Sequence, residues 1–164
     1  MTRAKIGDIF SIQISKGKVF FQYTNSERGK EYIKIFEGIY EDTFSNYEDL
    51  LNINVRFMIS YSVKLAYKHK LIDYEYYLPL IGENIPKYTR TPWTLTGKFE
   101  GWLIENTTTK ERRLVQYMTD EEKNYSPSGW VNHEYLIEML EMNFKLQNWD
   151  NEYILKNLSN EALK

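Results

Sequence analysis

The chain has 164 residues, of which 42% are hydrophobic and 27% are charged, and this composition is typical of a folded globular protein rather than of a disordered chain. It contains no cysteine, which excludes disulfides, thiol nucleophiles and cysteine-based zinc or iron–sulfur sites. The 21 basic and 23 acidic residues leave a formal net charge of −2, without the basic excess typical of dedicated nucleic-acid-binding proteins.

We expect neither a secretory signal at the N-terminus nor a membrane span. Its first five residues are followed by Gly7 and Asp8 rather than by the apolar core of a signal peptide, and no apolar run approaches the roughly 18 residues that a membrane span needs. We therefore expect cytoplasmic localisation and no membrane partner.

The first forty residues predict an antiparallel meander. Aromatic and β-branched residues are concentrated at 10–14, 19–24 and 32–40, and a Gly17 turn and a polar loop at 25–30 separate these stretches. A short helix is expected at 43–51, because Ser45 or Asn46 can serve as its N-cap and acidic residues follow.

The middle of the chain contains the clearest strand pattern. Between 55 and 63 apolar and other residues alternate, which predicts a strand with one buried face; the apolar set is Val55, Phe57, Ile59, Tyr61 and Val63. Residues 66–80 are expected to continue the sheet, and 81–92 to form a loop. A hairpin is expected from 98–105 and 111–118, which flank a polar connection.

After Met118 the hydrophobic period changes from two to about 3.6, and the charge becomes acidic, with 4 basic and 9 acidic residues. Residues 130–145 predict a helix capped by Ser128, and 150–163 predict a second, amphipathic helix with a stripe at Ile154, Leu155, Leu158 and Ala162. We expect a single α+β domain over 1–164, mainly β in 5–118 and mainly helical in 119–164. Its sheet should be predominantly antiparallel and strongly bent or barrel-like, with the C-terminal helices packed on it.

The sequence offers little for catalysis. His69 and His133 lie in different elements, so a histidine-based metal site or a Ser-His-Asp triad has one imidazole at best. Phosphate-loop, dinucleotide and nucleophile-elbow glycine motifs are missing from the sequence. We expect a binding protein rather than an enzyme, with no cofactor and no metal. The abundant aromatics, including Phe20, Phe21, Tyr23, Tyr76 and Tyr77, are best explained by packing on a sheet.

Three acidic residues, Glu134, Glu138 and Glu141, fall with Lys145 within an arc of about 60° on the predicted helix. Three carboxylates in a row are most simply a solvated face, and glycosidase-type chemistry would require an acid in an apolar pocket facing another across a cleft. The alternative is a docking surface for a basic partner. These three residues, the acidic stripe, are therefore our candidate partner-binding residues.

The opening of the chain resembles the bacterial immunity protein 26 family. The similar residues are Lys5-Ile6-Gly7-Asp8-Ile9-Phe10-Ser11-Ile12-Gln13-Ile14, then the Gly17 turn and Val19-Phe20-Phe21-Gln22-Tyr23. The order of later features is also similar: Leu50-Leu51, the 55–63 strand, the 92–98 stretch and the acidic helix. The likeness covers about residues 5–145; the glycine that the family carries near Gln22 is missing, and the C-terminal helix is an addition.

This resemblance implies a small protein encoded beside a polymorphic or contact-dependent toxin, which it neutralises by stoichiometric binding without turnover. The cognate toxin domain, for example a basic nuclease, would be its partner. The resemblance does not assign Gly7 or Asp8 to the interface, since a turn glycine and a strand-initiating aspartate have structural roles. The alternative is a nucleic-acid-binding small β-barrel, which requires a basic face assembled from Lys16, Lys18, Arg28, Lys30 and Lys34.

Overall fold

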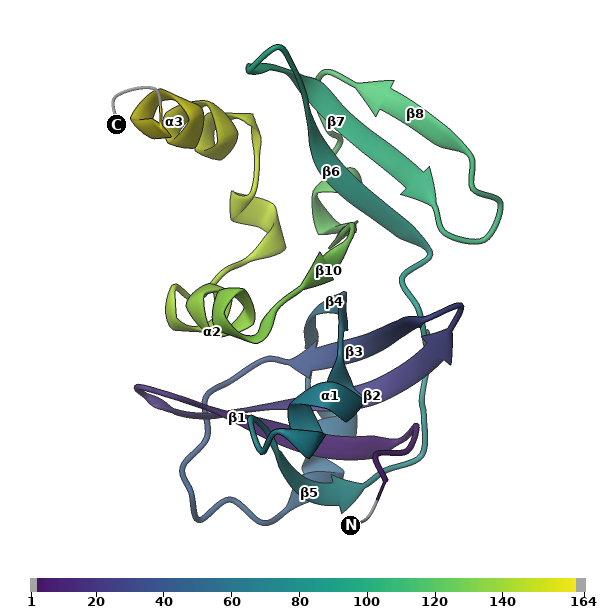
Figure 1. Ribbon diagram of the computed structural model, residues 1–164, viewed down its shortest axis with the longest axis vertical. Coiled ribbons are helices and arrows are strands. Elements are labelled where there is room, and N and C mark those ends of the chain that lie inside the picture. Colours follow the sequence, from purple (N-terminus) through teal and green to yellow (C-terminus); the bar gives the residue numbers. More distant parts are fainter. Residues whose placement is uncertain (1–2, 162–164) are drawn as a thin grey trace. The chain divides into compact units, whose positions relative to one another are not determined.

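The computed structural model describes residues 3–161 (Figure 1). Its contacts divide the chain into two compact units: unit 1 extends to Ile85 and includes Gly129–Asn143, and unit 2 comprises Pro86–Ser128 and the chain from Phe144 onward. Each unit combines strands from the first 118 residues with a helix from the remainder. Helices from 119–164 therefore belong to both units.

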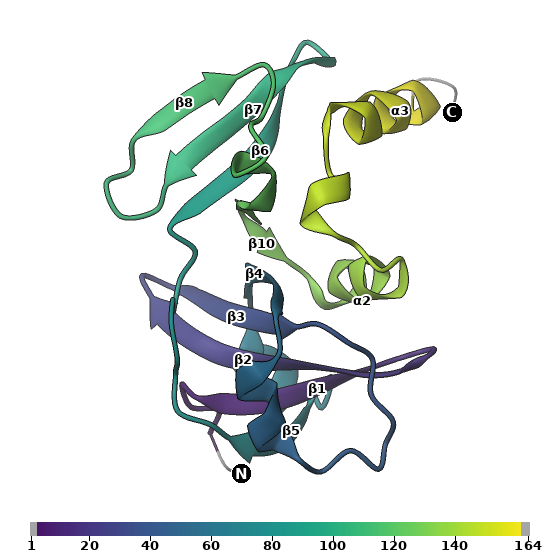
Figure 2. The same ribbon diagram turned by 180° about the vertical axis from the view of Figure 1, so that it is seen from behind.

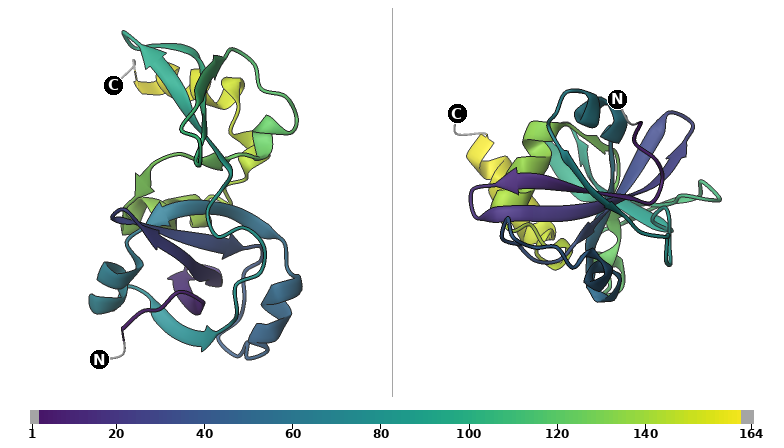
Figure 3. Two further views of the ribbon diagram at one scale, coloured as in Figure 1. Left: turned by 90° about the vertical axis from the view of Figure 1, so that its right-hand side faces the viewer. Right: turned by 90° about the horizontal axis from the view of Figure 1, so that it is seen from below.

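Unit 1 contains a six-stranded sheet in the order β10-β4-β3-β2-β1-β5. Strands β1 to β5 pair antiparallel with their neighbours, whereas β10 runs parallel to β4. Figure 3 shows β1 and β2 as a long hairpin (purple). The strands are β1 (Asp8–Ile14), β2 (Gly17–Glu27), β3 (Lys30–Phe36), β4 (Val55–Tyr61), β5 (Asp73–Tyr77) and β10 (Trp130–Val131).

The β1–β2 turn requires glycine at position 17. Gly17 has a φ of 137°, and a Cβ atom there would lie 2.5 Å from the backbone oxygen of Tyr40. This close approach allows Lys18 and Tyr40 to exchange two backbone hydrogen bonds of 2.8 Å. The segment after β3 is thereby held beside the hairpin.

Both faces of the sheet in unit 1 are covered. One face carries the buried set Phe10, Ile12, Val19, Phe21, Tyr23, Ile33, Ile35, Phe57 and Ile59. On the other, Ile9, Phe20, Phe36, Leu50 and Leu78 form a cluster against which Tyr40, Phe44 and Tyr47 pack. The prediction of a strand at 55–63 with one buried face is therefore wrong in part: Met58 and Ser60 are buried as well, and Val63 already belongs to helix α1 (Val63–Lys68).

Three further expectations for unit 1 need correction. Residues 66–80 continue the sheet only where β5 pairs with β1, because residues 66–68 belong to α1. The helix expected at 43–51 is a 3-10 helix, η1 (Tyr47–Asn52). The helix expected at 130–145 is shorter, α2 (His133–Glu141), because Trp130–Val131 pairs with β4 instead. The N-cap of α2 is Asn132 rather than the expected Ser128, and the Asn132 side chain accepts a 2.8 Å hydrogen bond from the Tyr135 N–H.

Unit 2 contains a four-stranded sheet in the order β8-β7-β6-β9. The predicted hairpin is present as β7 and β8, whereas β6 forms partly from residues expected in a loop. Helix α3 matches the expected second helix over the described residues; Ala162 and Leu163 lie outside them. The elements are β6 (Tyr88–Leu95), β7 (Lys98–Asn106), β8 (Arg112–Val115), η2 (Glu122–Asn124), β9 (Ser126–Pro127), η3 (Leu146–Asn148) and α3 (Asn151–Glu161).

One buried arginine joins the sheet of unit 2 to its C-terminal segment. The guanidinium of Arg90 lies 4.8 Å from the ring centroids of both Trp102 and Trp149. It donates to four backbone carbonyls, those of Lys123, Tyr125, Leu146 and Trp149, over 2.5–3.1 Å. Leu146 and Trp149 are therefore held against β6 by hydrogen bonds as well as by aromatic packing.

The α+β class with mainly antiparallel pairing is confirmed. Both sheets are open, with β5 and β10 at the edges of one and β8 and β9 at the edges of the other, so neither is a closed barrel. Helix α2 lies near β1, and α3 lies near β7. None of the helices described is long and apolar enough to cross a membrane.

Candidate functional site

The edge strand β5 presents three exposed tyrosines, Tyr74, Tyr76 and Tyr77, which we call the tyrosine edge. Their exposed fractions are 48%, 40% and 55%. Figure 2 labels β5 on the ribbon of unit 1. We predicted Phe20, Phe21, Tyr23, Tyr76 and Tyr77 to pack on the sheet, and the first three are indeed buried. The last two are not, so this prediction is wrong for the tyrosines of β5.

Tyr76 rests on a second tyrosine from η1. The rings of Tyr76 and Tyr47 are stacked, with their centroids 5.4 Å apart and an interplanar angle of 15°. The Tyr76 hydroxyl donates over 3.4 Å to Oε1 of Glu48, which also belongs to η1. Stacking and hydrogen bonding thus hold an exposed ring in one orientation, which lowers the entropy lost when a partner packs on it.

Glu75 forms a polar cluster beneath the tyrosine edge. Its carboxylate accepts hydrogen bonds from the Ser11 hydroxyl (2.6 Å) and the Tyr47 hydroxyl (2.7 Å), and lies 3.3 Å from Nζ of Lys18. Burial alone would raise the pKa of Glu75, but these hydrogen bonds and the Lys18 charge outweigh it and hold the pKa below its ordinary value. Burial and the bond to Glu75 raise the pKa of Tyr47 to about 12.

Tyr74 and Tyr77 are supported by neighbouring parts of unit 1. Tyr74 makes an edge contact with Phe10, at a centroid distance of 6.0 Å. Tyr77 lies against Gly7, where a Cβ atom would be 2.5 Å from the ring and where φ is +99°. The Asp8 carboxylate accepts a 2.7 Å hydrogen bond from the Lys5 N–H. Gly7 and Asp8 thus have the local structural roles expected for them, one beneath Tyr77 and the other at the start of β1.

The surroundings of the tyrosine edge are acidic on the η1 side. Carboxylates of Asp42, Glu48, Asp73 and Glu75 lie on or beside it, and the amine of Lys18 contacts two of them, at 3.8 Å from Asp42 and 3.3 Å from Glu75. Lys68, at the end of α1, and Lys70, in the turn that follows it, are both exposed. A partner that contacts the strand and η1 therefore meets mainly negative charge.

Replacing Glu75 with glutamine is expected to lower the free energy of unfolding by about 1–2 kcal/mol at pH 7, because charge-assisted hydrogen bonds become neutral ones. Since the folded-state pKa of Glu75 is depressed, its ionised form stabilises the fold above the unfolded-state value of about 4.3, and this stabilisation disappears as the pH falls through the folded-state pKa. Urea unfolding from pH 7 down to pH 3 should show the two proteins converging. A difference that stays constant with pH would contradict this account; exposed Glu48→Gln is the matched control.

The three residues of the acidic stripe are not equally accessible in the structure. Glu134 and Glu138 are exposed on α2, whereas Glu141 accepts hydrogen bonds from both the backbone N–H and the hydroxyl of Ser15 at the β1–β2 turn. These bonds lower the pKa of Glu141. Docking of a partner on the stripe stays a prediction, with Glu134 and Glu138 as its accessible members.

The two histidines are placed apart from the tyrosine edge. His69 is exposed after α1, and Nδ1 of His133 lies 2.8 Å from the buried Tyr61 hydroxyl. Burial lowers the pKa of His133 and raises that of Tyr61, so both groups favour their neutral forms. Across residues 3–161, no three His, Asp or Glu side chains gather in a way that could hold a metal ion.

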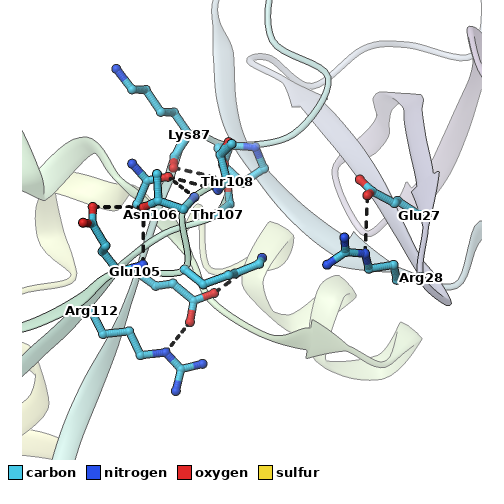
Figure 4. A network of polar contacts seen from close by, with 12 residues as sticks. Glu27, Arg28, Lys87, Glu105, Asn106, Thr107, Thr108 and Arg112 are labelled. Atoms are coloured by element: carbon cyan, nitrogen blue, oxygen red, sulfur yellow. Dashed lines mark hydrogen bonds and ion pairs between the residues drawn. The ribbon is translucent and has the colours of Figure 1, made fainter.

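Two of the basic residues that the nucleic-acid alternative requires on one face are not free to bind phosphates. Lys34 is buried and donates over 2.7 Å to the backbone oxygen of Ile81, and Lys18 is paired with Glu75. Arg28 is paired with Glu27 on the surface. In unit 2 the basic residues at 110–113 are likewise paired: Arg112 binds Glu105 over 2.5 Å beside the Asn106-capped turn (Figure 4), and Arg113 binds Glu122.

Comparison of this chain with protein-family models, with curated proteins and with solved structures finds no match. The resemblance to the immunity protein 26 family therefore rests on the residues and the order of features given above.

Proposed function

We propose that this protein is an immunity protein that binds a cognate bacterial toxin and neutralises it stoichiometrically in the cytoplasm of the producing cell. The observation that carries the proposal is the tyrosine edge. Tyrosines are enriched at protein–protein interfaces because a large ring with few rotatable bonds contributes apolar contact while its hydroxyl remains hydrogen-bonded. Three of them exposed on one five-residue strand favour a protein partner.

The charge around this strand indicates the kind of toxin. The carboxylates of Asp42, Glu48 and Asp73 favour a partner with a basic surface, such as the substrate cleft of a nuclease. An acidic surface of this kind accelerates association and can occlude a site that normally binds phosphates. Neither step requires a cofactor or turnover.

Co-expression with the toxin encoded beside this gene is expected to restore growth, and the two proteins should co-purify at a fixed ratio. An immunity protein from an unrelated toxin pair serves as the control. Rescue without a detectable complex, or rescue that depends on turnover of a small molecule, would contradict the proposal and support an enzyme. Tight binding of the purified protein to DNA or RNA at physiological salt would support the nucleic-acid alternative instead.

A further inference from the structure

We infer that β5 is the docking strand of this protein and that it pairs, edge to edge, with an extended, positively charged segment of the partner. The inference rests on the proposed function, because it supposes a protein partner, and it adds where and how that partner binds. It combines the unpaired backbone of β5, the tyrosine edge and the acidic groups beside it.

The backbone of β5 is available on its outer side. Leu78, directly after the strand, donates its N–H to the Gly7 oxygen over 3.1 Å, on the β1 side. Successive N–H groups of a strand point in opposite directions, so the N–H of Tyr77 points away from β1. Within the described residues β5 has β1 as its one sheet neighbour. An added strand would satisfy these outward groups.

The side chains of β5 lack two common protections of an edge strand. Natural edge strands commonly carry lysine or proline, which discourage pairing with other chains. Residues Asp73–Tyr77 contain neither, and instead present three tyrosines. The strand is short, and its register against β1 shifts at a bulge near Glu75, both of which limit indiscriminate aggregation without closing the edge to a partner of matching twist.

The charges select the incoming segment. Asp73 lies on β5, and Glu48 accepts from the Tyr76 hydroxyl, so two exposed carboxylates flank the exposed rings. Lysine or arginine side chains on an extended partner segment would contact these carboxylates and the faces of the tyrosine rings. An acidic or purely apolar segment would lack these contacts.

Hydrogen–deuterium exchange on the full chain, alone and with the inactivated toxin domain encoded beside this gene, tests the position of the interface. Exchange in the peptide that covers Asp73–Tyr77 is expected to slow by at least about 10-fold in the complex, because outward amides become hydrogen-bonded. A complex that forms with protection elsewhere and none in this strand would overturn the inference while leaving the proposed function intact. If no complex forms, the proposed function itself fails.

A proline substitution tests the backbone pairing. Tyr77→Pro removes the outward N–H and the ring, and Tyr77→Ala removes the ring alone, so their difference reports the strand pairing. We expect the proline variant to bind the toxin domain at least about 10-fold more weakly than the alanine variant, with both unfolding cooperatively. Equal affinities in folded variants would overturn pairing through β5.

A charge reversal tests the partner chemistry and does not depend on the proline variant. Glu48→Lys with Asp73→Lys should slow association by at least about 10-fold at low salt and flatten its salt dependence. The matched control is Glu134→Lys with Glu138→Lys, which changes the net charge equally on α2. If the α2 variant slows association and the β5 variant does not, the acidic stripe is the interface and the inference is wrong.

Discussion

Replacing Arg90 with methionine is expected to destabilise unit 2 by at least about 3 kcal/mol. Methionine approximates the length and apolar stem of arginine but removes the guanidinium donor from four backbone carbonyls. The Leu146 carbonyl still accepts a 3.1 Å hydrogen bond from the Trp149 N–H, so the cost falls on the other three, at about 1–3 kcal/mol for each buried group left unsatisfied. The stacking of the guanidinium on Trp102 and Trp149 is lost as well. Removing a buried charge recovers part of this cost, because burial is also what lowers the pKa of Arg90 to about 10.

Two further variants separate the geometry of Arg90 from its charge. Arg90→Lys keeps the positive charge, but one ammonium with three donors cannot serve four carbonyls and the two indole faces, so it should also destabilise the unit. Arg112→Met removes an exposed guanidinium, paired with Glu105, and should cost no more than about 1 kcal/mol. Urea unfolding followed by tryptophan fluorescence measures all three. An Arg90→Met protein within about 1 kcal/mol of the parent would refute the structural role given to Arg90.

The strands of the first meander could be predicted because alternation, turn glycines and β-branched residues all indicate the same structure. The helix at 130–145 was predicted too long, because the apolar residues that extend its pattern serve other elements. Val131 belongs to β10, and Asn143, with a φ of 52°, follows the end of α2. Helical periodicity identifies an apolar face but cannot show that a parallel pairing with β4 competes for the first turn.

The tyrosine edge was missed because β-propensity is the same for a buried and an exposed tyrosine. A signal was nevertheless present in the sequence: the run Asp73-Tyr-Glu-Tyr-Tyr contains no aliphatic residue, whereas the buried strands β1 and β3 are rich in isoleucine.

The buried position of Arg90 could not be predicted from the sequence. Its acceptors are backbone carbonyls separated from it by about 30 to 60 positions, and backbone acceptors leave no mark in composition or spacing.

Replacing Phe57 with aspartate is expected to lower the free energy of unfolding of unit 1 by at least about 3 kcal/mol, because it places an unpaired carboxylate in the core. Phe57 is 2% exposed in β4 and lies opposite Ile35 of β3. Burial would raise the folded-state pKa of the new aspartate above its unfolded-state value of about 4, so the penalty should shrink as the pH falls from that raised pKa toward about 4 and stay constant below it. Val55→Asp is the matched control, since Val55 lies on the same strand but is 42% exposed, and its change should stay near about 0.5 kcal/mol. Equal stability of the two aspartate variants, measured by urea unfolding, would show that the buried face of β4 is assigned wrongly.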